Sequence, residues 1–295
     1  MDFGQLTENR TVMLMNRCLF PYIQVHMPFH LLRETYLPLV MAERINPEVA
    51  ISHRDLDECP REVFLEIGGK LQEAGLRVTV HLPFLDLRPG AIDPLVRRVS
   101  KERIGDALDL SVFFRPVSVV CHAAFDSRYY PSDEEQWLNN SRETFRSFLP
   151  RARTLACPIC VENVYETTPV ILKRLLDGVN SPFLRFCFDT GHHNVFSEVP
   201  LEDWINTLSP YLTQLHLHDN QGSRDQHLPP GEGNFPFGDL FTMLKKRNLT
   251  PIVTLETHSL ENFRKAVARI GESGWFPLKA AGAEEIEKAS GETLS

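Results

Sequence analysis

The stretches 184-LRFCFDTGH-192 and 212-LTQLHLHD-219 decide the fold class of this chain. Each begins as a short apolar run and ends in acidic and histidine side chains. Short apolar runs bounded by polar residues are typical of strands that are buried on both faces of a parallel sheet. Polar groups at the carboxyl ends of such strands are typical of barrel enzymes, which place their chemistry there. The two stretches therefore predict neighbouring strands whose ends contribute to one site.

The same type of run recurs along the chain, with longer amphipathic segments between the runs. We predict eight strands, at residues 22–25, 48–52, 77–82, 117–121, 159–162, 184–188, 212–217 and 252–256. Apolar residues at three- and four-residue spacing predict helices at 64–74, 102–113, 134–156, 168–176 and 239–246. Strands that alternate with helices indicate an α/β protein, and eight such units predict a single (β/α)8 TIM barrel. An open Rossmann-type sheet is the alternative, but no G-x-G-x-x-G sequence follows the first run.

The barrel is predicted to occupy residues 19–279 as one domain, between an N-terminal extension (1–18) and a polar C-terminal tail (280–295). No apolar run approaches the ~20 residues that a membrane-spanning helix requires. The first residues lack the apolar segment of a signal peptide, so we expect a cytoplasmic protein with no membrane partner. The formal charge of −8 does not favour a broad nucleic-acid-binding face, and we expect no nucleic-acid partner. The sequence leaves the oligomeric state open.

The third to the eighth predicted strands all end in side chains that can bind divalent metals. In chain order these are His81, His122, Glu162, Asp189 with His192, His216 with His218, and Glu256, while Asp225 and His227 follow the seventh strand in a loop. In a parallel barrel all of these ends open on one face. Imidazole and carboxylate groups suit Zn²⁺ or Mn²⁺. Burying so many carboxylates without cations would be very costly, so the set predicts a metal cluster.

Each of these residues also has a simpler interpretation. A single histidine at a strand end is more often a hydrogen-bonded loop residue than a ligand, and a loop carboxylate often caps the next helix. We leave His193 and His258 in that group. Spacing does not choose between His216 and His218, because residues two apart face the same side of a strand. It is the convergence of six strand ends that favours ligation.

The segments V-E-N, F-D-T-G-H, Q-L-H-L-H-D-N, D-Q-H-L-P-P-G-E-G-N-F and T-L-E-T, in this order, resemble the xylose isomerase-like TIM barrel superfamily. The superfamily includes the AP endonuclease family 2 proteins, and the resemblance extends over residues 22–270. Its sugar isomerases and epimerases hold one or two metals, and the resemblance places their ligands on Glu162, Asp189, His216 and Glu256. Its endonuclease IV branch holds three zinc ions. The resemblance then implies one ion on His81, His122 and Glu162, a second on Glu162, Asp189, His216 and Glu256, and a third on His192, Asp225 and His227.

The resemblance favours His216 over His218 as the ligand of the seventh strand, because H-L-H-D aligns with H-L-N-D in the family. The surroundings of His81 (H-L-P-F-L-D-L-R-P-G) and of His122 (C-H-A-A-F-D) differ from those of the DNA-repair enzymes. The first of them is more similar to bacterial barrels named sugar-phosphate isomerases. Cleavage at apurinic sites therefore ranks below the other activities that the resemblance implies.

Our leading hypothesis is an enzyme that hydrolyses a small phosphoester or phosphodiester with a multinuclear zinc or manganese site of up to three ions. Glu162 or Glu256 would orient or deprotonate the attacking water. Arg88, Arg128 and Arg224 follow the third, fourth and seventh strands and are candidates for holding phosphate, although a loop arginine is more often simply solvated. His218 is a further candidate for substrate contact.

The alternative is an isomerase or epimerase of a sugar or sugar phosphate with one catalytic metal. In that enzyme Glu162 and Glu256 would form a proton-transfer pair, and His192 would contact substrate instead of metal. A third hypothesis is a barrel that binds a ligand without catalysis. The complete ligand set, with carboxylates available as bases, favours an enzyme over this third hypothesis.

Overall fold

The computed structural model describes residues 17–275, so the predicted tail and all but the last two residues of the predicted N-terminal extension lie outside it. The strands are β1 (Ile23–Pro28), β2 (Asn46–Ala50), β3 (Thr79–His81), β4 (Ser118–His122), β5 (Ile159–Glu162), β6 (Leu184–Asp189), β7 (Leu212–Leu217) and β8 (Ile252–Leu255). The α-helices are α2 (Phe29–Leu31), α3 (Leu37–Glu43), α4 (His53–Glu58), α5 (Arg61–Glu73), α6 (Pro94–Ser111), α7 (Glu134–Leu155), α8 (Val170–Val179), α9 (Thr190–Phe196), α10 (Leu201–Leu208), α11 (Phe237–Lys246) and α12 (Leu260–Ser273). Shorter helical turns are η1 (Arg17–Tyr22), the π-helical η2 (Leu32–Tyr36) and η3 (Val112–Phe114).

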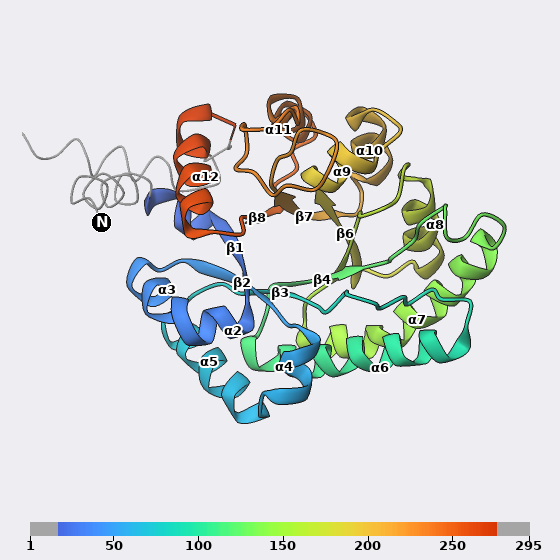
Figure 1. Cartoon of the computed structure of the whole chain (residues 1–295), viewed down its shortest axis with the longest axis horizontal. Helices are drawn as coiled ribbons and strands as arrows, with labels where there is room; N and C mark the ends of the chain where they lie inside the picture. The colour runs from blue at the N-terminus through green and yellow to red at the C-terminus, as the bar shows by residue number, and fades with distance from the viewer. Residues whose placement is uncertain (1–16, 276–295) are drawn as a thin grey trace, which may run out of the picture.

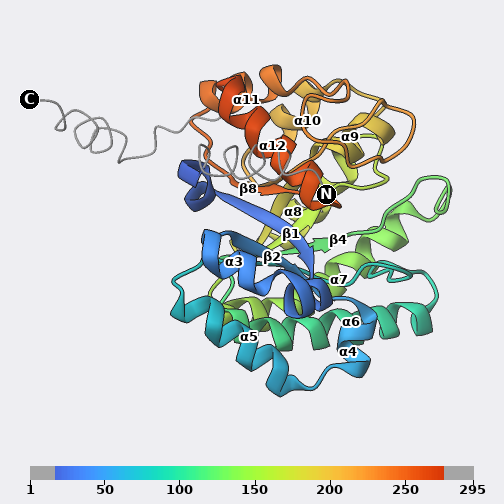
Figure 2. The same ribbon diagram turned by 60° about the vertical axis from the view of Figure 1, so that its left-hand side comes forward.

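The eight strands form a closed parallel barrel with helices around it (Figures 1 and 2), which confirms the predicted (β/α)8 architecture. Each strand pairs with the next along the chain, and β1 closes the barrel on β8, with Ile23 opposite Val253 and Val25 opposite Leu255. Because all strands run the same way, their carboxyl ends open at one end of the barrel.

Every predicted strand lies within three residues of an observed one at both ends. β5 shows why the short apolar runs were reliable. All four of its residues are buried, including the terminal Glu162. Helices cover the outside of a parallel barrel and packed side chains fill its inside, so its strands have no solvent-facing positions.

Helix α6 begins at Pro94, eight residues before the predicted start at 102. Its first turns expose apolar side chains, Leu95 at 61% and Val99 at 47%, so the apolar spacing does not mark them. The start is set by Asp93 instead, whose carboxylate accepts the backbone N–H of Leu95 at 2.7 Å. Proline at the first helical position follows this cap, a favoured combination.

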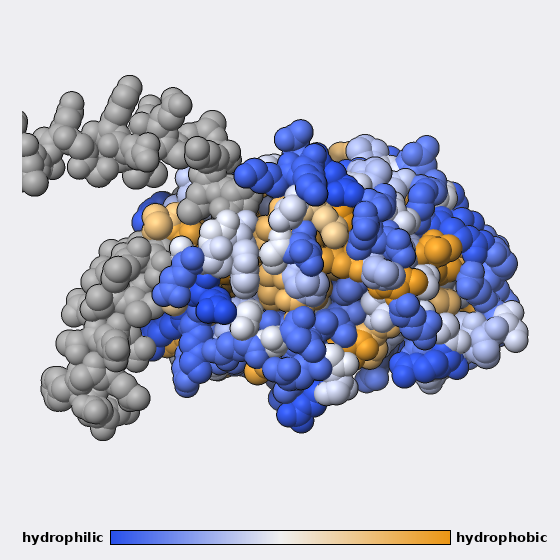
Figure 3. All heavy atoms as spheres, turned by 90° about the horizontal axis from the view of Figure 1, so that it is seen from above, coloured by the Kyte–Doolittle hydropathy of each residue, from blue (hydrophilic) through white to orange (hydrophobic). Residues whose placement is uncertain are grey.

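The core lies between the barrel wall and the helices. Phe29 and Phe64 stack with ring centroids 4.2 Å apart, and Phe114 meets them edge-on. Trp137 of α7 is fully buried. Seen from above (Figure 3), hydrophilic side chains cover most of the surface and apolar ones form a broken band, as expected for helices with one buried face. None of the helices within residues 17–275 is both long and apolar enough to cross a membrane.

Candidate metal centre

The ladder of strand pairs brings the histidines and carboxylates together at the carboxyl end of the barrel. His122 is the register partner of Glu162 across β4 and β5, and Asp189 is the partner of His216 across β6 and β7. Register partners on neighbouring parallel strands point their side chains to the same face of the sheet. All four side chains therefore face the mouth of the barrel.

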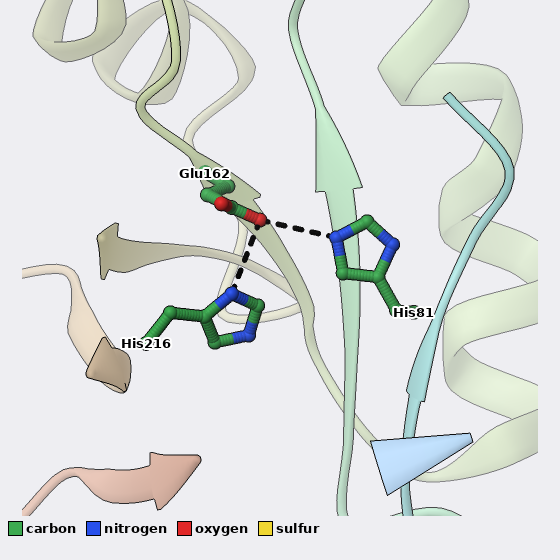
Figure 4. Close-up of side chains that lie close together, drawn as sticks. All are labelled: His81, Glu162 and His216. Carbon is green, nitrogen blue, oxygen red and sulfur yellow. Dashed lines mark hydrogen bonds and ion pairs between the residues drawn. The ribbon is translucent and has the colours of Figure 1, made fainter. Parts of the chain in front are cut away.

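Glu162 is the centre of this group, and it is 1% exposed. Its Oε2 lies 3.2 Å from His81 Nε2, 3.3 Å from His122 Nε2 and 3.5 Å from His216 Nδ1. Figure 4 shows the imidazoles of His81 and His216 converging on this oxygen from two sides. The other oxygen, Oε1, lies 3.1 Å from Nδ1 of His192. Four imidazoles thus surround one carboxylate.

A second group joins four strands. Glu162, Asp189, His216 and Glu256 each offer one ligand atom, and these atoms lie within 4.8 Å of one another. Asp189 is held in place by its backbone, because its N–H donates to Asn163 Oδ1 at 2.9 Å and its carbonyl accepts from Asn163 Nδ2 at 3.0 Å. All four members are buried, so a cation among them would be shielded from bulk water.

A third group lies beside the second, towards the loop that follows β7. Asp225 reaches His192 Nε2 at 3.5 Å, His218 Nδ1 at 3.4 Å and His227 Nδ1 at 3.4 Å. The imidazoles of His218 and His227 are parallel and stacked, with centroids 4.0 Å apart. His218 Nε2 lies 2.9 Å from Asp189 Oδ2, so this histidine connects the second group to the third.

The loop that carries Asp225 and His227 is fixed by Asp219, which is completely buried. One carboxylate oxygen of Asp219 accepts the backbone N–H groups of Gly231 and Gly233, each at 2.9 Å. The other accepts that of Phe235 at 3.1 Å. His227 adopts a positive φ of 50°, which is uncommon outside glycine. These hydrogen bonds anchor the segment that follows Asp225 and His227 to the end of β7.

The spacing of the polar atoms suits bound divalent cations. Two ligand atoms, each about 2.1 Å from a tetrahedral zinc ion, lie about 3.4 Å apart. Direct charge-assisted hydrogen bonds are shorter, at about 2.7–2.9 Å. Eight nitrogen–oxygen separations among the described residues of the centre lie near the longer value, between 3.2 and 3.5 Å, for example His81–Glu162 (3.2 Å) and His227–Asp225 (3.4 Å). The pairs His216–Glu256 and His218–Asp189, at 2.9 Å each, have the length of hydrogen bonds.

Unpaired polar atoms point to the same conclusion. Among the described residues, His216 Nδ1, His218 Nδ1 and Glu256 Oε2 are buried without a hydrogen-bond partner. Burial alone would raise the pKa of Glu162 and of Glu256, but the surrounding histidines outweigh it and hold both pKa values well below the ordinary 4.5. Both carboxylates are therefore ionised at neutral pH and available to a cation. The residues present fit a histidine–carboxylate site for Zn²⁺ or Mn²⁺.

All nine residues expected to bind metal lie in these three groups. The arginines expected to hold phosphate make their contacts elsewhere. Arg128 forms a bidentate pair with Asp126, at 3.0 and 2.8 Å, and Arg88 lies 4.2 Å from the ring centre of Tyr129. Arg224 is exposed. None of the three forms an ion pair with a carboxylate of the centre within residues 17–275.

Three residues near the centre received no role from the sequence. His26 of β1 meets the ring of His81 edge-on at 5.6 Å, and Glu48 of β2 lies 3.0 Å from His216. His258 stacks on His227 with centroids 3.8 Å apart. The position of His258, two residues after Glu256, could have indicated that it lies near the centre. His193, in contrast, packs against Phe188, Trp204 and Phe235 in the core.

The fold and the centre together define a TIM barrel with a buried histidine–carboxylate cluster at the carboxyl ends of its strands. The chain belongs to the xylose isomerase-like TIM barrel family, whose model matches residues 46–274. Among curated proteins it is similar to the uncharacterized protein MJ1311 of Methanocaldococcus jannaschii, with 28% identity over 65% of this chain and 67% of that protein. Among solved structures it is similar to the TTHB071 protein from Thermus thermophilus soaked with ZnCl₂, with 27% identity, a TM-score of 0.70, and coverage of 84% of this chain and 98% of that one. It also shares its fold with a D-tagatose 3-epimerase-like protein, with 23% identity, a TM-score of 0.69, and coverage of 85% and 96%.

Proposed function

We propose that this protein is a divalent-metal-dependent isomerase or epimerase of a small sugar. The observation that carries the proposal is the convergence of Glu162, Asp189, His216 and Glu256, all buried, from four different strands. These are the positions at which the family resemblance places the metal ligands of sugar isomerases. The similarity to a D-tagatose 3-epimerase-like protein favours this activity over the phosphoester hydrolysis that led our expectations from the sequence.

These four residues would hold the catalytic cation. When bound, a divalent cation polarises a carbonyl oxygen and so acidifies the neighbouring carbon-bound proton. Nδ1 of His216 lies 2.9 Å from Oε2 of Glu256 and 3.5 Å from Oε2 of Glu162, so both carboxylates border the same position. Zn²⁺ and Mn²⁺ are the ions that this set of nitrogen and oxygen ligands suits.

Glu162 and Glu256 would move the proton. They belong to the ends of β5 and β8, which are separated by β6 and β7, and therefore approach the centre from different sides. One ionised carboxylate would take the proton from the carbon next to the carbonyl, leaving its electron pair in the enolate. The other, after taking up a proton from solvent, would deliver that proton to the opposite face of the carbon, and the first would release its proton to solvent. The product then has the inverted configuration, and neither atoms nor electrons are gained or lost.

The test is exchange of the carbon-bound proton with solvent. Metal-reconstituted protein should convert one member of a panel of free ketohexoses in heavy water, with deuterium appearing beside the carbonyl in the product's NMR spectrum. Glu162→Gln should abolish both conversion and exchange while the circular dichroism spectrum stays unchanged. The matched control is Glu66→Gln, the same chemical change on the surface of α5, where Glu66 pairs with Lys70. Full turnover by Glu162→Gln would remove this residue from the mechanism.

Hydrolysis of a small phosphoester is the second candidate, because the centre offers more ligands than one ion needs. His81, His122, His192, Asp225 and His227 remain after the four core ligands are assigned. Clustered cations are typical of phosphoester hydrolases. We rank this activity second because Arg128 is already neutralised by Asp126 and Arg88 lies over Tyr129. Release of inorganic phosphate from sugar phosphates, with no conversion of free ketoses, would reverse the ranking.

A further inference from the structure

Glu48 is an ionisable side chain buried deep in the barrel, below the metal centre. It lies on β2 and is 0% exposed. Acidic side chains are almost never fully buried unless they are paired, because removing the charge from water is costly. Its neighbours therefore show what holds it there.

One oxygen of Glu48 is saturated by donors from three other strands. Oε2 accepts the hydroxyl of Thr79 at 2.9 Å, the hydroxyl of Thr254 at 3.1 Å and the side-chain amide of Gln214. Thr79 is also the register partner of Glu48 across β2 and β3. With three donors on this oxygen, the carboxylate cannot turn, and the direction of Oε1 is fixed.

The other oxygen faces a proposed metal ligand. Glu48 Oε1 lies 3.0 Å from Nε2 of His216, while Nδ1 of the same ring faces Glu256 at 2.9 Å, Glu162 at 3.5 Å and Asp189 at 3.9 Å. The two ring nitrogens thus have different surroundings. An ionised carboxylate can only accept a hydrogen bond, and a neutral imidazole carries its hydrogen on one nitrogen alone.

Gln214 also lies near Nε2 of His216, at 3.4 Å, and the buried Cys187 thiol contacts the same ring. Its amide nitrogen already donates to Glu48 Oε2 and to Thr254 Oγ1, at 3.0 Å for the latter. An amide nitrogen has two hydrogens, so none is left for His216. Glu48 Oε1, which is buried and makes no hydrogen bond to another described residue, is therefore the charged acceptor that faces Nε2 of His216.

We propose that Glu48 is a positioning residue that keeps the hydrogen of His216 on Nε2, so that Nδ1 presents its lone pair to a cation held by Glu162, Asp189 and Glu256. Carboxylates that orient a metal-bound histidine raise metal affinity by about 10- to 100-fold in other proteins. This inference depends on the metal centre of the proposed function and not on its reaction.

Glu48→Gln tests the inference because it reverses the hydrogen bond. The three donors around Oε2 require an oxygen there, so the amide nitrogen must take the place of Oε1 and donate to Nε2 of His216. The ring hydrogen then moves to Nδ1, where the cation binds. We expect zinc affinity, measured by competition with a chromophoric chelator, to fall about 10- to 100-fold. The control is Thr79→Val, which removes one donor to Oε2, leaves Oε1 facing His216, and should retain the wild-type affinity.

NMR of the zinc-loaded wild-type protein with ¹⁵N-labelled histidine gives a readout that neither activity nor the folding of a variant can affect. The spectrum should show hydrogen on Nε2 of His216 and zinc on Nδ1. Hydrogen on Nδ1, zinc on Nε2, wild-type zinc affinity in Glu48→Gln, or a wild-type protein that binds no zinc would each overturn the inference. Loss of zinc affinity in Glu48→Gln, in a protein that converts no sugar, would support the inference and reject the proposed function.

Discussion

Gly191→Ala should damage the metal centre through a single added carbon. Gly191 lies in the first turn of α9, and its φ is not positive, so alanine fits the backbone. The added Cβ, however, would lie 2.8 Å from Nε2 of His218 and closer still to two other ring atoms. Carbon atoms pack at about 3.5–4.0 Å, so the ring would have to move by at least about 1 Å. His218 cannot move freely, since its 2.9 Å contact with Asp189 and its stacking on His227 fix it.

The expected loss of stability combines two effects. Overpacking of a buried site costs about 1–3 kcal/mol, and a weakened hydrogen bond to a charged group adds about 1.5–3 kcal/mol at most. We expect the free energy of unfolding to fall by about 2–4 kcal/mol, which lowers Tm by about 3–6 °C in a chain of this size. The variant should also lose zinc bound near Asp225 and His227, because His218 contacts both of these side chains.

Differential scanning calorimetry and metal analysis of the purified variants measure both effects. The control is Gly69→Ala in α5, where an added Cβ meets nothing within 4 Å. In a helix interior this change should stabilise the protein by up to about 1 kcal/mol. A Gly191→Ala protein with wild-type Tm and wild-type zinc content would refute the view that His218 is pinned between Asp189 and Asp225.

Three other outcomes follow from the centre. Dialysis against a chelator should abolish turnover, and Zn²⁺ or Mn²⁺ should restore it; chelator-insensitive turnover would reject the metal centre. Replacing His81 and His122 together by glutamine should abolish binding of one ion but preserve the ion held by Glu162, Asp189, His216 and Glu256. Anomalous diffraction counts the ions, and an unchanged count would contradict this prediction. Burial raises the pKa of Glu166 from 4.5 to about 7, so the folded protein binds this proton more tightly than the unfolded chain and loses stability as pH rises through that interval. Between about pH 5 and pH 8, the free energy of unfolding of Glu166→Gln, measured in urea, should therefore rise by about 2–3 kcal/mol relative to that of the wild type. A difference between the two proteins that does not change with pH would contradict the shifted pKa.

The strands were predictable because a closed barrel buries both of their faces, which leaves a continuous apolar run in the sequence. Helices were predictable only where one face is buried over several turns, as in α7 and α8. Helix α10 had such a face in Leu201, Trp204, Ile205 and Leu208, and the signal was overlooked. Helix α9 has only seven residues, and it begins where Asp189 accepts the backbone N–H of His192 at 2.6 Å. A segment that short shows no period, so residues 189–192 were predicted to lie at the end of the sixth strand.

The strand-end residues of the candidate site were predictable for a topological reason. In a parallel barrel the carboxyl ends of all strands meet, so sequence position alone predicts their proximity. Glu48 and His26 could not be found this way. Each lies within its strand, two residues before the strand's last residue. The role of a polar side chain at such a position can be inferred only when the side chains that face it from the other strands are known. Phosphate binding by Arg128 stays a prediction, and the structure adds that its guanidinium pairs with Asp126, two residues earlier.

The order of the strands along the chain also determines when the candidate metal centre can first form during synthesis. Glu256 follows the last strand, and its partners come from β5, β6 and β7, so a ribosome must release almost the whole barrel before the pocket exists. A chain truncated before β8 lacks Glu256, and the half from β1 to β4 lacks all four residues of this group, whereas the half from β5 to β8 carries all four. Zinc uptake during synthesis would therefore report completion of the second half of the barrel.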